Sequence, residues 1–254
     1  MVAVVTGGNR GIGAAIASAF ASAGAKLAIA ARDDSSLEQT AESIRQTGAE
    51  CVAIKCDVSS EDSVATLGAD VYRYYDQVDI VVANAGIGGP TAPMQEISYE
   101  EWRQCLAIDL DGVFLTFRRF IPRMVERRQG CLIAISSMTG KRPLLGRTPY
   151  AASKMGIIGL VRTLALELGP AGIRVNAVCP GAVEGPRIDT VIERQARIQG
   201  VSHETARAQL VDASPLRRTV PASDVAATCL FLASSAADSI TGEDLNVTAG
   251  LVMY

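Results

Sequence analysis

The chain has 254 residues, of which 48% are hydrophobic and 20% charged, and these are the values of a globular protein, not of a disordered chain. A net charge of −3 without a cluster of Lys and Arg argues against nucleic acid or an anionic membrane as a partner. The single histidine, His203, and six widely spaced cysteines exclude the common metal sites. We expect no metal, buried reduced thiols, and a cytoplasmic protein without a signal peptide, because the opening apolar run Val2–Val5 leads directly into a glycine turn.

Short apolar runs alternate with longer amphipathic segments along the whole chain. The runs are rich in Val, Ile and Ala and mostly lack polar alternation, which is typical of strands buried on both faces of a parallel sheet. They predict strands at Val2–Val5, Lys26–Ala31, Cys51–Lys55, Asp79–Ala83, Cys131–Ser136, Arg174–Val178 and Asp244–Val247.

Helices are predicted between these strands, over residues 11–23, 34–47, 60–75, 98–127, 150–168 and 223–234. Gly24 and Gly48 lie where the first two should end, and Ser98 and Ser223 lie where two later ones should begin with a capping hydroxyl. The alternation predicts an α/β fold, a single doubly wound Rossmann domain over residues 1–254 with a parallel seven-stranded sheet and helices on both faces. The charged stretch 182–214 contains no strand and is predicted as an insertion.

A glycine-rich turn, Thr6–Gly13 with the sequence TGGNRGIG, follows the first strand and opens a helix. Glycine lets the backbone turn tightly and approach a phosphate, while the helix N-terminus offers unpaired N–H groups and the positive end of its dipole. The preceding strand and following helix are the context that a dinucleotide site requires. We therefore predict that this turn binds the phosphates of a dinucleotide.

Three further residues suit acid–base chemistry on a carbonyl group. Tyr150 and Lys154 are four apart on a predicted helix, so they share one face, and a nearby ammonium favours the phenolate that a general acid–base needs. Ser137 follows the fifth strand at the carboxyl edge of the sheet, where its hydroxyl would polarise a carbonyl or orient an alcohol. It is not expected to be a nucleophile, because neither a histidine partner nor a nucleophile elbow accompanies it.

Taken in order, these motifs resemble those of the short-chain dehydrogenase/reductase family. The resemblance covers nearly the whole chain and is specific because the motifs occur jointly, on the expected elements. One position departs, since Ala83 stands where the family usually has an asparagine. The matching segments are the TGxxxGxG turn at 6–13, Asn84-Ala85-Gly86, Ser137, the YxxxK segment Tyr150-Ala151-Ala152-Ser153-Lys154, Arg174-Val175-Asn176 and Pro180-Gly181.

The resemblance implies that Ser137 orients the substrate, Tyr150 transfers the proton, and Lys154 contacts both the cofactor ribose and Tyr150. Asp109 stands where the family's fourth catalytic residue, an asparagine, would fall. It either keeps a water-mediated proton relay through its backbone carbonyl or caps a local irregularity of the helix. The implied cofactor-binding residues are Gly7, Asn9, Arg10, Gly11, Ile12, Gly13, Arg32, Asp57, Val58, Asn84, Ala85, Gly86, Tyr150, Lys154, Pro180, Gly181 and Val183.

The end of the second strand should select the cofactor, because an acid there binds the free 2′-hydroxyl of NAD and a base accommodates the 2′-phosphate of NADP. Ala31 occupies the position at which NAD-preferring relatives usually carry Asp, Arg32 follows it, and Arg10 lies within the glycine turn. Two guanidinium groups favour NADP(H), which we predict. Asp33 and Asp34 keep NAD(H) as the alternative, since a small shift of the strand end would bring a carboxylate to the ribose.

We expect an oxidoreductase that transfers a hydride between NADP(H) and a small alcohol or carbonyl compound, such as a 3-oxoacyl, hydroxy-acid, sugar or polyol compound. The alternatives are a catalytically silent nucleotide-binding sensor or scaffold, and an isomerase or dehydratase on the same fold. The resemblance makes 182–214 a substrate lid and implies a homotetramer or homodimer. It also puts Lys141, Arg142 and Arg147 beside the substrate pocket, where one of them would bind an anionic substrate unless all three point into solvent.

Overall fold

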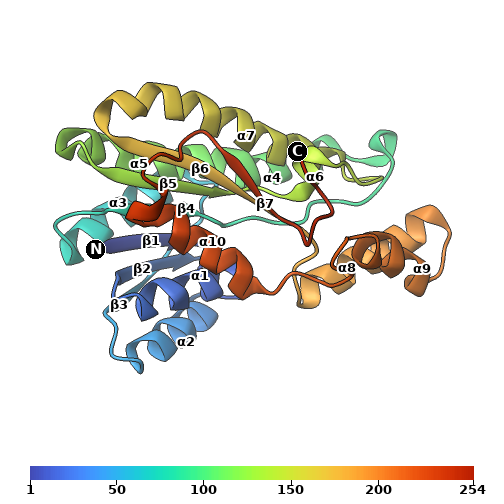
Figure 1. Cartoon of the computed structure of the whole chain (residues 1–254), viewed down its shortest axis with the longest axis horizontal. Coiled ribbons are helices and arrows are strands. Elements are labelled where there is room, and N and C mark those ends of the chain that lie inside the picture. Colours follow the sequence, from blue (N-terminus) through green and yellow to red (C-terminus); the bar gives the residue numbers. More distant parts are fainter.

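The structure is a computed structural model that describes residues 1–254. Seven parallel strands form one sheet in the order β3-β2-β1-β4-β5-β6-β7 (Figure 1). The order reverses between β1 and β4, which makes this the predicted doubly wound arrangement and leaves a crevice at the carboxyl ends of these two strands. The strands are β1 (Val2–Thr6), β2 (Lys26–Ala31), β3 (Cys51–Lys55), β4 (Ile80–Ala83), β5 (Gly130–Ile135), β6 (Ile173–Pro180) and β7 (Asp244–Val247).

Helices cover both faces of the sheet (Figure 1). One layer consists of α1 (Gly11–Ser22), α2 (Asp34–Arg45) and α10 (Ala222–Ala233). The other consists of α3 (Glu61–Tyr74), α5 (Gly112–Arg127) and α7 (Thr148–Leu168). The remaining helices lie around the carboxyl edge of the sheet and are α4 (Tyr99–Leu106), α6 (Met138–Lys141), α8 (Pro186–Gln199) and α9 (His203–Arg207).

Two apolar cores lie on the two faces of the sheet, and the strands contribute to both by alternation. In β1, Val2 and Val4 face the core under α3, α5 and α7, while Ala3 and Val5 face the core under α1, α2 and α10. Because the side chains of a strand alternate between faces, a strand buried on both sides must be apolar throughout. This explains why the sequence shows unbroken apolar runs.

Some predicted boundaries are wrong. The predicted helix 98–127 is interrupted by a π-helical turn at Ala107–Asp111, between α4 and α5. Ser98 caps α4 as predicted, in a capping box with Glu101, but Ser223 caps nothing, because α10 begins at Ala222 after Pro221. Asp79 lies just outside β4, where its carboxylate accepts from the Val2 N–H and pairs with Arg127.

The charged stretch at 182–214 forms α8, α9 and a second π turn, without a strand, as predicted. These elements lie beyond the carboxyl edge of the sheet (Figure 1). They have a small core of their own, in which Ile192, Leu210 and Val211 pack with Met138, the residue after Ser137. The insertion is therefore anchored beside the predicted catalytic serine.

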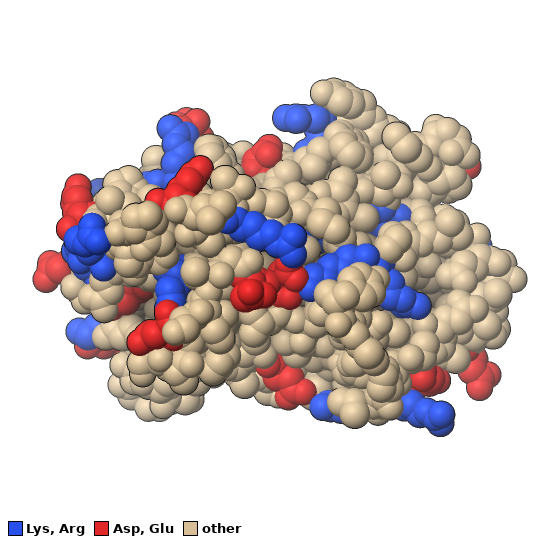
Figure 2. Space-filling view, turned by 45° about the horizontal axis from the view of Figure 1, so that its top comes forward, with Lys and Arg blue, Asp and Glu red and all other residues tan.

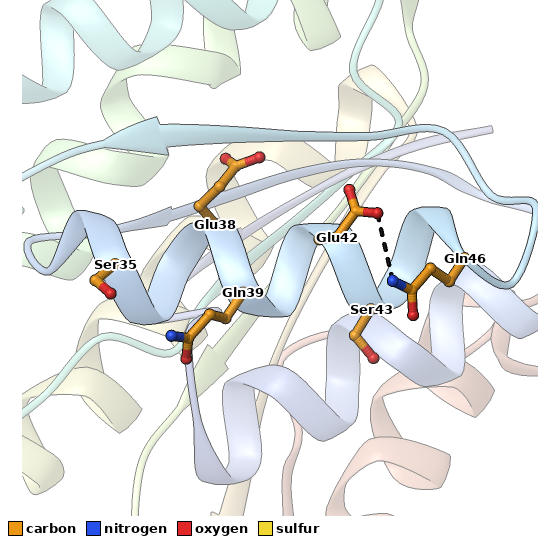
Figure 3. Close-up of a pocket in the computed structure, with 6 residues that line it drawn as sticks. All are labelled: Ser35, Glu38, Gln39, Glu42, Ser43 and Gln46. Atoms are coloured by element: carbon orange, nitrogen blue, oxygen red, sulfur yellow. Dashed lines mark hydrogen bonds between the residues drawn. The ribbon is translucent and has the colours of Figure 1, made fainter.

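The surface and the thiols follow the composition. All six cysteines are free and buried, as predicted, and no helix has both the length and the apolar character to cross a membrane. The outer face of α2 carries a shallow depression in which Glu42 accepts a hydrogen bond from Gln46 (Figure 3). It is lined only by polar side chains on one solvated helix face, away from the crevice, and has no features of a ligand site.

Candidate active site

The glycine turn is joined to the end of β4 by side-chain hydrogen bonds. The Thr6 hydroxyl accepts from the backbone N–H groups of Asn84 and Ala85 at 3.1 and 3.2 Å. The Asn84 amide donates to the carbonyls of Thr6 and Gly7 at 2.9 and 3.1 Å. These bonds hold the first and fourth strand ends together at the crevice, where open α/β sheets bind their ligands.

The turn has the space and the donors that a pyrophosphate needs. A Cβ on Gly13 would lie 2.0 Å from the Gly7 carbonyl oxygen, and Gly7 itself has a φ of +65°, so both positions require glycine. No side chain caps the N-terminus of α1 and its first turn has no acid, so the N–H groups of Gly11, Ile12 and Gly13 remain free for a phosphate. The residues present fit a dinucleotide.

The end of β2 lies at Ala31, as predicted. The two acids that follow, which could have bound a cofactor ribose, interact with neighbouring side chains and backbone groups instead. Asp33 caps α2 by accepting from the Ser36 N–H at 2.8 Å, and hydrogen bonding to Ser36 lowers the pKa of its carboxyl. Asp34 pairs with Lys55 at 2.9 Å. Arg10 and Arg32 are exposed and form no ion pair, so both guanidinium groups are available to a ligand.

The other residues implied at the cofactor site lie on the same edge of the sheet or in the loops beyond it. Asn9 donates to the Ser36 hydroxyl, and Asp57, after β3, accepts from Ser59. Val58 is buried against Gly112, and Val183 bridges to Val220. Pro180 ends β6, and Gly181 packs so closely on Thr248 that a Cβ would lie 2.8 Å from its Cα.

Ser137, Tyr150 and Lys154 are all buried where β5 meets α7, with exposed fractions of 8%, 8% and 4%. Lys154 donates from Nζ to the Ile135 carbonyl at 3.0 Å and lies 5.6 Å from the centre of the Tyr150 ring. Ser136 binds the Lys154 carbonyl at 2.7 Å, which joins the strand end to the helix. The predicted shared face of Tyr150 and Lys154 is confirmed.

Ser137 is the N-cap of α6, a helix that the sequence did not predict. Its Oγ accepts from the Thr139 N–H at 3.1 Å. Because the oxygen is held as an acceptor by the backbone, the hydroxyl hydrogen remains free to be donated to a ligand. This is the role expected of a residue that polarises a carbonyl.

Asp109 is fully buried in the π turn between α4 and α5. Its Oδ1 accepts from the Ile87 N–H at 2.6 Å, and its Oδ2 has no hydrogen-bond partner. Burial raises the pKa of this carboxyl, against the opposing effects of Lys154 and the Ile87 bond. The helix irregularity is present, but Asp109 does not cap it: the side chain instead connects the π turn to the loop after β4.

The three basic residues between Ser137 and Tyr150 separate in the structure. Lys141 lies almost buried between β7 and the C-terminus, where it pairs with Asp244 and donates to the carbonyls of Asp244 and Tyr254. Arg147 is also buried, with its guanidinium carbon 4.5 Å from the centre of the Tyr150 ring. The alternative that all three point into solvent is therefore wrong, and only Arg147 reaches Tyr150.

Other chemistry has little support at this site. Two thiols lie near the site: Cys105, packed against Gly89, and Cys179, beside Ser136 and Ser137. Burial raises the pKa of each to about 11, so neither is a thiolate at neutral pH. No group of three His, Cys, Asp or Glu side chains is arranged to hold a metal ion. Basic and acidic side chains are interspersed over the face shown in Figure 2, without an extended patch of one sign.

Comparison with known proteins decides the family. The family model described as enoyl-(acyl carrier protein) reductase matches residues 7–252. Ketoacyl reductase 1 of the granaticin polyketide synthase of Streptomyces violaceoruber is 39% identical, over 100% of this chain and 93% of that protein. The chain belongs to the short-chain dehydrogenase/reductase family, and it is an NAD(P)-dependent oxidoreductase.

Solved structures of this family superpose on the chain closely. Actinorhodin polyketide ketoreductase with NADPH has a TM-score of 0.94 at 37% identity, covering 100% of this chain and 97% of that one. NAD⁺-bound xylitol dehydrogenase has a TM-score of 0.95 at 29% identity, covering 98% of each. Both cofactors thus occur among short-chain dehydrogenases of the same shape as this one.

Sequence reasoning missed two contributors to the site of this short-chain dehydrogenase. The Thr6 hydroxyl, which fixes the β4 end, stands inside the quoted glycine motif, so its position was the available signal. Arg187, at the start of α8, has its guanidinium carbon 5.7 Å from the Tyr150 ring centre. In sequence it is one of many charges in a helical stretch, and nothing there distinguishes it.

Proposed function

We propose that the chain interconverts a ketone and a secondary alcohol with NADP(H) as cofactor, through Ser137, Tyr150 and Lys154. The observation that carries this is the placement of a buried tyrosine and lysine on one helix face, at the strand end that also holds Ser137. Burial strengthens each electrostatic interaction among these groups, and the carboxyl edge of the sheet brings them next to the glycine turn.

In the reductive direction the substrate oxygen would lie between Ser137 and Tyr150. Ser137 donates its free hydroxyl hydrogen to that oxygen, since its Oγ already accepts from the Thr139 N–H at 3.1 Å. Tyr150 delivers a proton from Oη to the same oxygen, and the Lys154 ammonium stabilises the phenolate that remains. When bound, NADPH supplies the hydride that the carbonyl carbon accepts and leaves as NADP⁺.

The residues that we assign to the cofactor are those whose hydrogen-bond donors are free to bind it. The N–H groups of Gly11, Ile12 and Gly13 would bind the pyrophosphate, and Lys154 would contact the nicotinamide ribose. Arg10 and Arg32 would hold the 2′-phosphate, which supports NADP(H) over NAD(H), because the nearby Asp33 is engaged at the start of α2. The NADPH complex of a relative supports the same choice.

We also propose that residues 1–254 form one domain in which 182–214 acts as a lid, and that the enzyme is a homotetramer in the cytoplasm. The lid proposal is supported by contacts of α8 with loops of the site: Gln195 donates to the Leu145 carbonyl and Arg194 to the Gly89 carbonyl. The oligomer proposal is supported by Met155 and Leu166, which are exposed on α7. Light scattering at micromolar concentration tests it, and a monomeric mass would refute it.

The function is tested with purified enzyme, NADPH or NADH, and a panel of ketones, by following the loss of cofactor absorbance. We expect turnover with NADPH that falls about 10²- to 10⁴-fold in Tyr150→Phe, while fluorescence shows that the variant still binds NADPH. Turnover that persists in Tyr150→Phe would refute the assigned role, and tight cofactor binding without reduction of any ketone would refute the reaction.

A further inference from the structure

Arg147 is a buried cation whose donors have almost no acceptors in the protein. Its exposed fraction is 3%, and its guanidinium forms no ion pair. The one hydrogen bond it makes is long, from Nη1 to the Thr91 hydroxyl at 3.4 Å, and its Nε has no partner. An arginine has five N–H donors, and a donor left unpaired out of water, as Nε is here, is costly. Such a side chain is arranged for an acceptor that the protein itself does not provide.

The guanidinium of Arg147 lies at the reacting end of the site. Its carbon is 4.5 Å from the centre of the Tyr150 ring, and Gly88, after β4, is also close, since a Cβ there would be 3.8 Å from Nη1. Gly88 lacks a side chain that would cover this group. An acceptor bound by Arg147 would therefore be only a short molecular span from an oxygen bound to Tyr150.

A second arginine lies close to the same tyrosine ring. Arg187, in the first turn of α8, has its guanidinium carbon 5.7 Å from the same ring centre, and it makes no ion pair. Arg194, two turns further along α8, holds the helix against the loop after β4 through the Gly89 carbonyl at 3.2 Å. Arg147, the residue just before α7, and Arg187, in the first turn of α8, thus both lie close to the Tyr150 ring.

The buried acid Asp109 forms no ion pair with either arginine, although the charges of both lower the pKa of its carboxyl against the larger effect of burial. It lies in the π turn, where its Oδ1 accepts from the Ile87 N–H, and a Cβ on Gly86 would lie 3.0 Å from Oδ1 and 3.5 Å from the Lys154 Nζ. Burial lowers the pKa of Arg147; Tyr150 and Cys105 oppose this effect, and the positive charges of Arg187 and Arg194 add to it. An anion bound between the arginines would offset both the burial and the positive charges.

We propose that Arg147 and Arg187 bind a carboxylate of the substrate, so that the enzyme acts on short oxo acids and the matching hydroxy acids. A carboxylate suits the planar guanidinium fork of Arg147, because two parallel N–H···O bonds satisfy donors that otherwise have almost no acceptors in the protein. The reaction is the one proposed above: the carbonyl carbon gains hydride, its oxygen gains the Tyr150 proton, and the carboxylate is unchanged. The inference rests on that proposed function.

The test compares substrates that differ only in charge. The pairs are 4-oxopentanoate with 4-oxopentanamide, and 4-oxocyclohexanecarboxylate with 4-oxocyclohexanecarboxamide, assayed with NADPH in wild type, Arg147→Met, Arg147→Lys and Arg187→Met. We expect wild type to prefer the acid of at least one pair, and each Met variant to lower the acid-to-amide ratio of kcat/KM by about 10- to 100-fold, chiefly through KM for the acid. Arg147→Lys should retain part of the preference.

Arg197→Met is the matched control, because Arg197 is exposed in the last turn of the same helix, far from Arg187. It should leave the ratio unchanged. Equal losses of kcat for acid and amide in Arg147→Met would overturn the proposal, because the arginine would then act on Tyr150 and not on the substrate. An unchanged acid-to-amide ratio in Arg187→Met would show that Arg187 does not bind the carboxylate.

A binding measurement separates this inference from the reaction itself. Calorimetry on the NADP⁺-loaded enzyme should detect cyclohexanecarboxylate, which has no carbonyl to reduce, and should detect cyclohexanecarboxamide at least about tenfold more weakly. Carboxylate binding that requires Arg147, without turnover of any ketone, would uphold the anion site and refute the proposed reaction. Turnover of amides and acids at equal rates would uphold the proposed reaction and refute the anion site.

Discussion

The nucleotide side and the substrate side of the crevice differ in whether their charged side chains are exposed or buried. On the nucleotide side, Arg10 and Arg32 are exposed, and the joined strand ends are held by neutral groups such as Thr6 and Asn84. On the substrate side, Lys154, Arg147 and Asp109 are buried, and none of them has a salt-bridge partner within the protein. Exposed charges select a ligand at little cost to folding, whereas buried charges are expensive unless a ligand or neighbour compensates them.

This difference indicates which half depends on its ligand. The nucleotide half is built from backbone geometry, as in the close approach of Gly13 to the Gly7 carbonyl, and is complete without a cofactor. The substrate half keeps unpaired polar atoms at Arg147 Nε and Asp109 Oδ2. Substitutions on the two sides should therefore have different effects. Those on the substrate side should change the rate of the reaction, and those on the nucleotide side should change cofactor preference or stability.

After Tyr150, the largest effect is expected at Ser137. Ser137→Ala removes the hydroxyl that would bind the substrate oxygen and should lower kcat about 10²- to 10³-fold, as loss of one such donor does elsewhere. It should leave the dissociation constant for NADPH unchanged, because the nucleotide side lies on other strand ends. Ser137→Thr keeps a hydroxyl and serves as the control. Weaker NADPH binding in the alanine variant would contradict the expectation that substitutions on the substrate side leave cofactor binding unchanged.

On the nucleotide side, Arg32→Ala should change cofactor preference without changing the chemistry. Loss of a charge-assisted bond to the 2′-phosphate should reduce the NADPH-to-NADH ratio of kcat/KM about 10- to 100-fold, with the ketone KM unchanged. Arg73→Ala, an exposed arginine on α3, is the control. A wild type that prefers NADH, or a ratio that Arg32→Ala does not move, would show that the end of β2 has been misread.

The same contrast explains what the sequence predicts well. The sheet, most strand ends and the glycine turn were predicted, because each depends on residues that are adjacent in the chain. Strand β2 ends at Ala31 as expected, because Asp33 caps the next helix, which begins at Asp34. The YxxxK pair was predictable for the same reason, since four residues make one helical turn.

The substrate half was predicted less well because its contacts join distant segments. Arg187 reaches Tyr150 only through the path of α8, and Asp109 meets Ile87 only because a π turn interrupts the expected helix. Lys141 and Arg147 are six residues apart, yet one pairs with β7 and the other lies at the active site. Composition and spacing carry no signal that separates such residues, since each is one of many charges in its segment.

Backbone packing in the nucleotide half gives the third prediction. In Gly13→Ala the added Cβ would lie 2.0 Å from the Gly7 carbonyl oxygen, so the turn must shift. We expect a loss of about 1–3 kcal/mol in the free energy of unfolding by urea denaturation, together with weaker NADPH binding. The control is Gly169→Ala, where φ is −53° and nothing lies within 4 Å of the added atom. Its stability should stay level or rise by about 0.4–1 kcal/mol.

The smallest expected effect concerns the buried acid of the substrate half. Burial raises the pKa of Asp109 above its usual 3.8, so the folded state keeps this proton at a pH where the unfolded chain has released it. Stability must then fall as pH rises from about 4 through the folded-state pKa, and the full cost is present above that value. Asp109→Asn cannot titrate, and its amide oxygen still accepts from Ile87.

The difference in unfolding free energy between wild type and Asp109→Asn isolates this titration from all other carboxyl groups, because they are common to both proteins. Urea denaturation at a series of pH values should show wild type losing stability relative to the variant as pH rises. A flat difference would mean that burial and the Lys154 ammonium cancel at Asp109. A difference that moves in favour of wild type would mean that Lys154 dominates, and that the charges of the substrate half already neutralise one another without a ligand.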